Sequence, residues 1–501
     1  MSTTHGPVRG AALDGLQVFK GVRYGAPPTG EHRFKPPCPP EPWREVADCL
    51  ALGAPAIQHG RPPGEAVRGV IEANLGIDEV NPDEPGTTED CLFLNVWTPR
   101  VDRGRRPVMV WLHGGGYANG SGGETWYDGA ALARRGDVVV VTVNHRLNAF
   151  GYLQLSDLFG PEYAHSGQAG ILDIIQALTW VRENITEFGG DPGNVTIFGE
   201  SGGGAKVAML MSLPAASGLY HKAIIQSAGH AHRAMTREDA LTATRTFLSN
   251  AGVEPGDTAG LKALSADAVS RAAGGVPGDP MKEFAPCLDG DTVTRHPFEP
   301  DAPSESAQVP LLIGRTKDET LAFMHFHPQF GALEDADVAA HAQLEFGERS
   351  DEAEAAVRAA YPNYSPTDLL AALWTSTYIW GPALIIASRK AEQSAAPVWM
   401  YQLTWETPIG GLRSPHGIDV PLVFDNVDSA RSLVGPGDAP QRMADLLCDS
   451  WLAFVRTGNP ETPSLPAWPP YDTTRRATMF LDLESRIVDD LNVGLRRLLP
   501  T

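Results

Sequence analysis

The stretch 194–213 constrains the fold most, because a strand-like run leads through a glycine-flanked serine into a helix-like run. Residues 194–198 are rich in β-branched and aromatic side chains, which is typical of a short buried strand. Gly199 and Gly203 lack the Cβ atoms that would clash where the backbone turns sharply. Such a turn would hold the Ser201 hydroxyl outward, beside the positive end of a helix. The alternative is a flexible glycine loop that contains an incidental serine.

Strand-like and helix-like segments alternate along the first half of the chain, and further strand-like runs follow later. Continuous apolar runs at 107–112, 137–143, 309–313 and 398–403 are typical of strands buried on both faces of a sheet. Residues 170–188 carry apolar side chains at helical spacing. This order predicts an α/β fold with a mostly parallel central sheet flanked by helices.

No internal repeat and no linker divides the 501 residues, so we predict a single domain over residues 1–501 that carries three insertions. The segment from about 61 to 89 is rich in proline, glycine and acidic residues, which indicates a surface loop. The segments from about 236 to 271 and from about 332 to 373 are alanine-rich, acidic and helix-prone. We expect these two segments to form a helical cap over the carboxyl edge of the sheet.

The charge and composition exclude several classes of function. A formal net charge of −21 argues against nucleic-acid binding and favours neutral or cationic small-molecule substrates. The first residues do not resemble a signal peptide, and the longest apolar runs are too short to span a membrane. Five scattered cysteines without metal-ligand spacing indicate reduced thiols and no metal site. We therefore expect a cytoplasmic protein.

A second glycine-rich motif, His113 to Tyr117, follows the apolar run at 107–112. A serine hydroxyl is a weak nucleophile until a base removes its proton, and the oxyanion that forms needs N–H donors. Triple-glycine loops after a strand supply such donors. The simpler interpretation of this motif is a glycine turn. The occurrence of the motif together with the Ser201 turn favours an oxyanion loop. His113 is expected to hold this loop through hydrogen bonds rather than to act as the base.

Candidates for the acid and the base follow in the second half of the chain. Asp318 and Glu319 come just after the apolar run at 309–313, and spacing alone does not choose between these two carboxylates. Only one downstream histidine, His416, lies in a turn-rich segment after a predicted strand, which favours it as the base. The others lie in or just before a predicted helical insertion: His325, His327 and His341.

Several long motifs occur in an order that resembles the type-B carboxylesterase family, which includes para-nitrobenzyl esterases and cholinesterases. The motifs lie at 19–28, 33–37, 89–96, 188–201 and 451–471, so the likeness covers nearly the whole chain. This resemblance implies an α/β-hydrolase fold and a serine carboxylesterase that forms an acyl-enzyme intermediate. It calls for no metal and no organic cofactor.

The resemblance also implies a role for eight residues at matching positions. These are the nucleophile Ser201, the triad acid Glu319, the general base His416, the oxyanion-hole residues Gly115, Gly116 and Gly202, the acidic neighbour Glu200, and Ser227 as support for the acid. The Lys-Asp-Glu motif of the family assigns the acid to Glu319 rather than to Asp318.

Three departures from the family pattern are visible. Gly202 stands where most members have alanine, which leaves the backbone N–H donor in place but predicts a looser loop. Tyr117 replaces the usual phenylalanine and makes the acyl side of the pocket more polar. Cys91 lacks the upstream partner that many secreted relatives have, since residues 53–58 contain no cysteine. The last departure agrees with a reducing compartment.

Three other functions compete with ester hydrolysis. The same triad could act on an amide or carbamate bond, the fold could serve as a non-catalytic binding module, and an interfacial lipase would need an apolar lid that is not evident. The natural substrate and the choice between monomer and dimer stay open. Candidate pocket walls are the aromatic residues that flank the second helical insertion, namely Phe323, Phe326, Trp374, Tyr378 and Trp380.

Overall fold

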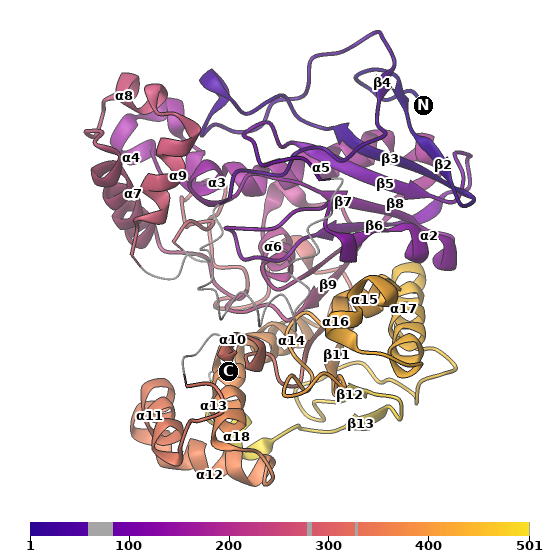
Figure 1. Cartoon of the computed structure of the whole chain (residues 1–501), viewed down its shortest axis with the longest axis vertical. Coiled ribbons are helices and arrows are strands. Elements are labelled where there is room, and N and C mark those ends of the chain that lie inside the picture. The colour runs from indigo at the N-terminus through magenta and orange to yellow at the C-terminus, as the bar shows by residue number, and fades with distance from the viewer. Residues whose placement is uncertain (59–83, 278–282, 326–328, 500–501) are drawn as a thin grey trace. The chain divides into compact units, whose positions relative to one another are not determined.

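The computed structural model describes residues 1–58, 84–277, 283–325 and 329–499 (Figure 1). These residues fall into two compact units. The first unit contains residues 1–58, 84–223, 233–277 and 283–306, and the second contains residues 224–232, 307–325 and 329–499. Most of the predicted loop insertion at 61–89 lies outside the described residues.

A mixed sheet forms the core of the first unit. Its strands follow one another in space as β2 (Ala11–Leu13), β3 (Leu16–Arg23), β5 (Phe93–Thr98), β7 (Val139–Val143), β6 (Arg106–Leu112) and β8 (Gly190–Glu200). The three strands β7, β6 and β8 are parallel, whereas β5 and β3 join the edge in antiparallel fashion. A separate short pair links β1 (Val8–Arg9) with β4 (Ala47–Asp48).

The apolar runs of the sequence form the strands predicted from them. Residues 108–112 in β6 and the valines of β7 are fully buried, as expected of strands covered on both faces. β8 begins at Gly190, four positions before the predicted start at 194, because glycine, proline and aspartate at 190–193 hide the strand pattern. The helix α5 (Ala169–Asn184) precedes β8 and the helix α6 (Gly202–Met211) follows it, and both lie close to their predicted bounds.

The second unit also contains strands, which include Ile224–Gln226 from the end of β9 (Lys222–Gln226). The next strands in space are β10 (Leu311–Thr316), β11 (Val398–Leu403), β12 (Thr478–Leu481) and β13 (Arg486–Val488). β10, β11 and β12 are parallel and β13 is antiparallel to β12. All six residues of β10 and of β11 are buried.

Both predicted helical insertions are helical. The first contains α7 (Arg237–Ala251), α8 (Thr258–Ala263) and α9 (Ala266–Gly274), and the second contains α11 (Asp335–Phe346), α12 (Ser350–Ala360) and α13 (Pro366–Thr375). Their function as a cap, and the single domain that carries them, stay predictions. The other helices are α2 (Ala130–Gly136), α3 (Asn148–Tyr152), α4 (Ser156–Phe159), α10 (Leu321–Met324), α14 (Gly381–Gln393), α15 (Asp419–Val423), α16 (Arg431–Val434), α17 (Ala439–Thr457) and α18 (Val493–Arg496).

One continuous helical stretch, Pro366–Gln393, joins α13 to α14 through the π-helical segment Ser376–Trp380. Among the described residues it is the single helix long and apolar enough to cross a bilayer. In its apolar window 78% of the surface is buried inside the protein, which is what the core helix of a folded domain shows. All five cysteines are free thiols, and the cytoplasmic location stays a prediction.

A buried ion pair fixes the end of β7 to α5. Arg146, three residues after β7, donates from Nε and Nη2 to the two carboxylate oxygens of Asp173, at 2.8 and 2.6 Å. The backbone N–H of Arg146 donates to the same carboxylate at 3.0 Å. Both side chains are almost completely buried, so loss of one partner would leave the other charge without solvent or counter-ion.

We therefore predict that Asp173→Ala lowers the free energy of unfolding by about 3–5 kcal/mol, because Arg146 stays buried without a partner. Urea denaturation followed by circular dichroism measures this change. Asp48→Ala is the matched control, since Asp48 pairs with Arg9 on the surface and should change the denaturation midpoint little. Equal effects of the two variants would contradict the prediction.

Candidate active site

Ser201 occupies a strained turn between the last residue of β8 and the first residue of α6. Its backbone has φ 55° and ψ −123°, a conformation that residues with a side chain rarely adopt. A Cβ on Gly199 would lie 2.5 Å from the carbonyl carbon of Gly203, and a Cβ on Gly203 would overlap the carbonyl oxygen of Leu112. The two glycines are therefore required by close backbone packing and do not indicate a flexible loop.

The loop His113–Tyr117 follows β6 directly and lies against the start of α6. Gly115 and Gly116 have φ values of 82° and 61°, the left-handed region that favours glycine. A Cβ on Gly202 would lie 2.5 Å from the Cα of Gly116, so the two backbones approach more closely than an alanine at 202 would permit. This arrangement brings together the backbones of the residues predicted to form the oxyanion hole.

Two stacked imidazoles and one lysine hold this loop. The Nδ1 of His113 lies 2.9 Å from the carbonyl oxygen of Gly114, and its ring stacks on that of His145 with centroids 4.7 Å apart. Burial lowers the pKa of both histidines well below its usual value, so both rings are neutral. The ammonium of Lys206 donates to the carbonyl oxygen of His113 at 3.0 Å. These contacts agree with the expected structural function of His113.

An acid–base pair lies in the second unit. The Nδ1 of His416 and the Oε2 of Glu319 are 2.6 Å apart, and Glu319 is completely buried. The other carboxylate oxygen of Glu319 accepts the backbone N–H of Thr316 at 2.7 Å, which fixes the carboxylate at the end of β10. The carboxylate that contacts His416 is therefore the one that the family motif indicates.

Asp318 has different partners. Its carboxylate accepts the hydroxyl of Tyr364 at 2.6 Å and the backbone N–H of Ser414 at 3.3 Å. The backbone N–H of Asp318 in turn donates to the carbonyl oxygen of Ser414 at 2.9 Å. Asp318 thus anchors the segment that leads to His416, whereas Glu319 contacts the imidazole.

The remaining candidate histidines do not form such a pair. His325 stacks against Phe330 with ring centroids 3.9 Å apart, and His341 lies on α11. In the described parts of the chain neither forms a salt bridge with a carboxylate. His327 lies outside the described residues.

Ser227, expected to support the acid, is buried next to β10. Its side chain is completely buried and its Oγ has no hydrogen-bond partner among the described residues. The backbone of Ser227 has φ 52°, and its N–H donates to the carbonyl oxygen of Gly314 at 2.8 Å. Both oxygens of Glu319 already have partners, Thr316 and His416. The support of Ser227 for the acid therefore stays a prediction.

Glu200, the residue before the nucleophile candidate, is buried at the end of β8. Its carboxylate lies beside the oxyanion loop, because a Cβ on Gly114 would be 3.0 Å from its Oε2. Its charge also contributes to the raised pKa of Tyr127, after burial and Glu124.

Two further buried ionisable residues were not among the site residues predicted from the sequence. Asp419 follows His416 by three positions and accepts hydrogen bonds from Gln226 (2.9 Å) and Tyr401 (3.0 Å). Burial, aided by the charge of Glu319, raises the pKa of Asp419 to about 6. Lys206 is the second. Each is a single charge inside an apolar run, and that pattern could have identified both.

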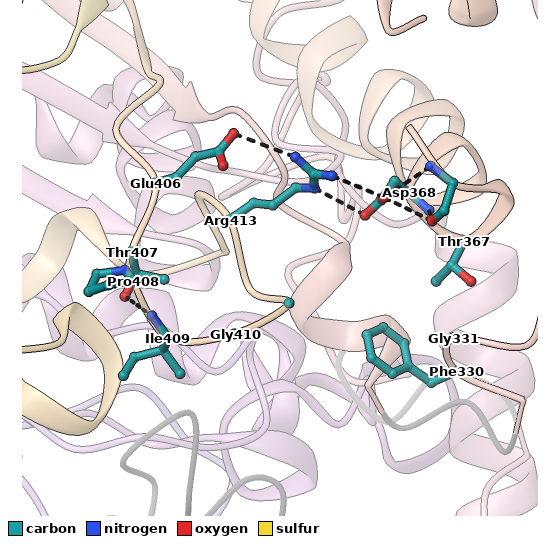
Figure 2. A pocket seen from close by; sticks show the side chains of 12 residues that line it. Phe330, Gly331, Thr367, Asp368, Glu406, Thr407, Pro408, Ile409, Gly410 and Arg413 are labelled. Atoms are coloured by element: carbon teal, nitrogen blue, oxygen red, sulfur yellow. Dashed lines mark hydrogen bonds and ion pairs between the residues drawn. The ribbon is translucent and has the colours of Figure 1, made fainter. Parts of the chain in front are cut away.

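A pocket of about 410 Å³ lies within the second unit, lined in part by the segment 406–411. Figure 2 shows Arg413 extended between Glu406 and Asp368 along one side, with Phe330 and Ile409 on the other. Arg413 forms two hydrogen bonds to Asp368, at 3.1 and 3.2 Å. The polar wall of the pocket is thus an internal ion-pair network, three positions before His416 in the chain.

Three of the aromatic residues expected at the pocket wall form a row that begins at His416. The ring of Phe323 lies 5.0 Å from that of His416 and 5.9 Å from that of Trp374, and Trp374 lies 6.2 Å from Tyr378. All three aromatic side chains are partly exposed. Trp380 is instead buried beneath Arg315, and Phe326 lies outside the described residues. No group of His, Cys, Asp and Glu suited to a metal ion occurs among the residues that the structure describes.

Comparison with known proteins shows which family the chain belongs to. Residues 1–493 match the Carboxylesterase family. The chain belongs to the carboxylesterase family. It is similar to the para-nitrobenzyl esterase of Bacillus subtilis (36% identity, 98% of this chain and 96% of the relative) and to the phenmedipham hydrolase of Pseudarthrobacter oxydans (33% identity, 98% and 96%). The crystal structure of the Geobacillus stearothermophilus carboxylesterase EST55 has a TM-score of 0.87 at 36% identity and covers 100% of this chain and 99% of that chain.

The family membership confirms the predicted α/β-hydrolase fold and the predicted activity class. This carboxylesterase is a carboxylic ester hydrolase. A para-nitrobenzyl esterase and a liver carboxylesterase are among its relatives, and these names do not favour the amidase alternative.

We predict that Gly202→Ala lowers kcat about 10-fold, because the new Cβ must push the backbone of Gly116 away and displace the oxyanion donors. Hydrolysis of p-nitrophenyl acetate measures kcat and KM. Gly274→Ala is the control, since a Cβ at 274 meets nothing within 4 Å. If Gly202→Ala keeps the kcat of the parent, the loop accommodates the methyl group and the prediction is wrong.

Proposed function

We propose that this carboxylesterase hydrolyses small-molecule esters through a triad of Ser201, Glu319 and His416. The observation that carries the proposal is the 2.6 Å contact between a buried carboxylate and the His416 imidazole. A carboxylate at Nδ1 fixes the tautomer in which Nε2 is free of its proton and acts as a base. The strained Ser201 turn at the head of α6 supplies the matching nucleophile.

The proposed reaction has two steps. In the first, the Oγ of Ser201 attacks the ester carbonyl carbon while Nε2 of His416 takes the hydroxyl proton. The bond to the alcohol oxygen then breaks, and His416 returns the proton to the leaving alcohol. In the second step a water molecule repeats the sequence on the acyl-enzyme and releases the carboxylic acid. Glu319 stabilises the imidazolium that forms in each step.

The oxyanion of each tetrahedral intermediate is held by backbone N–H groups of Gly115, Gly116 and Gly202. The contact between Gly116 and Gly202 supports this assignment, because it brings N–H groups from the loop and from the first turn of α6 close together. Each such donor contributes about 3 kcal/mol to transition-state stabilisation in serine hydrolases.

The proposed substrates are neutral or cationic esters that carry an aromatic group. The row of Phe323, Trp374 and Tyr378 starts at the His416 ring and offers partly exposed aromatic faces for stacking. The net charge of −21 disfavours the approach of anionic esters. A relative at 36% identity is a para-nitrobenzyl esterase, which supports an aromatic alcohol as the leaving group.

We predict that the protein cleaves p-nitrobenzyl and p-nitrophenyl esters and cleaves the matched p-nitroanilide at least about 100-fold more slowly. An anilide has the poorer leaving group and needs firmer protonation. Steady-state kinetics with both substrate types measure the ratio. Ser201→Ala should abolish ester cleavage and labelling by a fluorophosphonate probe at position 201. Labelling elsewhere, or activity of the alanine variant, would refute the nucleophile assignment.

A further prediction separates the two neighbouring carboxylates. Glu319→Gln should lower kcat by about 10³–10⁴-fold with little change in KM, because the imidazole loses its orienting charge. Asp318→Asn should keep most of the kcat, since Asp318 contacts Tyr364 and Ser414 rather than the imidazole. If Asp318→Asn loses more kcat than Glu319→Gln, the assignment of Glu319 as the triad acid is wrong.

A further inference from the structure

Lys206 is a buried charge in the first helix after the nucleophile. It lies in the second turn of α6 and its side chain is completely buried. In the part of the chain that the structure describes, no carboxylate lies within salt-bridge distance of its ammonium. An ammonium that is buried without a counter-ion lowers the stability of a fold. The contacts that Lys206 makes with neighbouring elements therefore indicate what the charge is used for.

Those contacts are with both ends of the oxyanion loop. The ammonium donates to the carbonyl oxygen of His113, the first residue of the loop, at 3.0 Å. It also lies 5.7 Å from the centre of the ring of Tyr117, the last residue of the loop, within the range of a cation–π contact. A single side chain on α6 therefore links the helix that carries the nucleophile to both ends of the loop.

The other titratable groups around Lys206 stay uncharged. Burial, assisted by the lysine charge, lowers the pKa of His113 and of His145 well below its usual value. Burial raises the pKa of Tyr117 and of Tyr152, which packs on it. The Nδ1 atoms of the two histidines face the carbonyl oxygens of Gly114 and Arg146, so each ring donates there as the neutral Nδ1–H tautomer.

The other charged residues in this region, the Arg146–Asp173 pair and Glu200, form no salt bridge with Lys206 in the described chain. Arg146 and Asp173 neutralise each other at 2.6 Å. Glu200 lies beside the loop at Gly114, and among the described residues no salt bridge joins it to Lys206. The ammonium is therefore the one positive charge directed at the loop, among the residues that the structure describes.

We propose that Lys206 is a positioning residue that holds the oxyanion loop against α6, so that acyl transfer is faster with its ammonium form than with the neutral amine. The proposal rests on the proposed function of Ser201 and the loop. Burial lowers the pKa of Lys206 to about 7, so the ammonium predominates below about pH 7 and the neutral amine above it. A neutral amine still donates, but its hydrogen bond is about half as strong and the cation–π contact is lost.

Activity and stability should respond to pH in opposite directions. Since the pKa of Lys206 lies below its value in the unfolded chain, folding excludes a proton between about pH 7 and 10.5, and stability increases as pH rises through this range. The loop contact weakens over the same range. A residue with only a structural function would not lower kcat as the fold becomes more stable.

The test compares wild type, Lys206→Met and Lys206→Gln in the hydrolysis of p-nitrophenyl acetate from pH 5.5 to 9.5. We expect the wild-type kcat to fall at least 3-fold above about pH 7 while KM changes little. Lys206→Met should have a kcat about 10-fold lower, no alkaline fall and a higher melting temperature at pH 6.5. Lys206→Gln keeps a neutral donor and should give an intermediate kcat, also without the alkaline fall.

Lys390→Met is the matched control. Lys390 is also completely buried, donates to the carbonyl oxygen of Ala307 at 2.7 Å, and has a pKa lowered by burial to about 8. Its replacement should leave kcat and the pH profile unchanged. Loss of the alkaline fall in this variant too would show a general effect of stability and overturn the proposal.

Fluorophosphonate labelling of the same preparations separates the two proposals. Wild type that is not labelled at Ser201 would refute the proposed function itself. Wild type labelled at Ser201, with a kcat that stays level up to pH 9.5, would overturn only the proposal for Lys206. This wild-type measurement decides the matter even if the Lys206 variants fail to fold.

Discussion

The close approach of two backbones, at the end of β6 and the start of α6, is the constraint on which the catalytic geometry depends. The absence of side chains at Gly199, Gly202 and Gly203 permits this approach, since a Cβ at any of them would meet backbone atoms of the turn, of Leu112 or of Gly116. Ser201 lies between these glycines, and its φ of 55° is set by the packing on both sides. The strain is maintained by rigid neighbours and needs no flexible loop.

Local patterns of the sequence predict the strands and helices because the signals are themselves local. The buried runs in β6 and β7, and the glycines around Ser201, each meet a requirement that a few consecutive residues express. β8 begins earlier than predicted because residues 190–193 have low strand propensity, whereas Gly190 pairs with Arg106 of the neighbouring strand β6 ahead of an irregularity in the register.

Contacts between distant positions could not be predicted from spacing. Asp318 and Glu319 are adjacent in sequence, and only the position of the backbone after β10 gives one of them Thr316 and His416 as partners. The family motif assigns Glu319, and Glu319 is the carboxylate that contacts His416 in the structure. A family motif identifies which residue should have a function. The hydrogen bonds of that residue, such as those of Glu319 with Thr316 and His416, are found only in the structure.

The cost of burying a charge is lowered in two different ways in this carboxylesterase. Arg146 and Asp173 neutralise each other through several hydrogen bonds, and such a pair serves the fold. Lys206 and Asp419 have no opposite charge in contact within the described chain, and burial moves their pKa values towards neutrality, to about 7 and about 6. Lys206 contacts the oxyanion loop and Asp419 lies beside the His416 segment. A charge that destabilises the fold and sits next to the machinery is better explained by the reaction than by stability, since replacement by an apolar residue would otherwise be favoured.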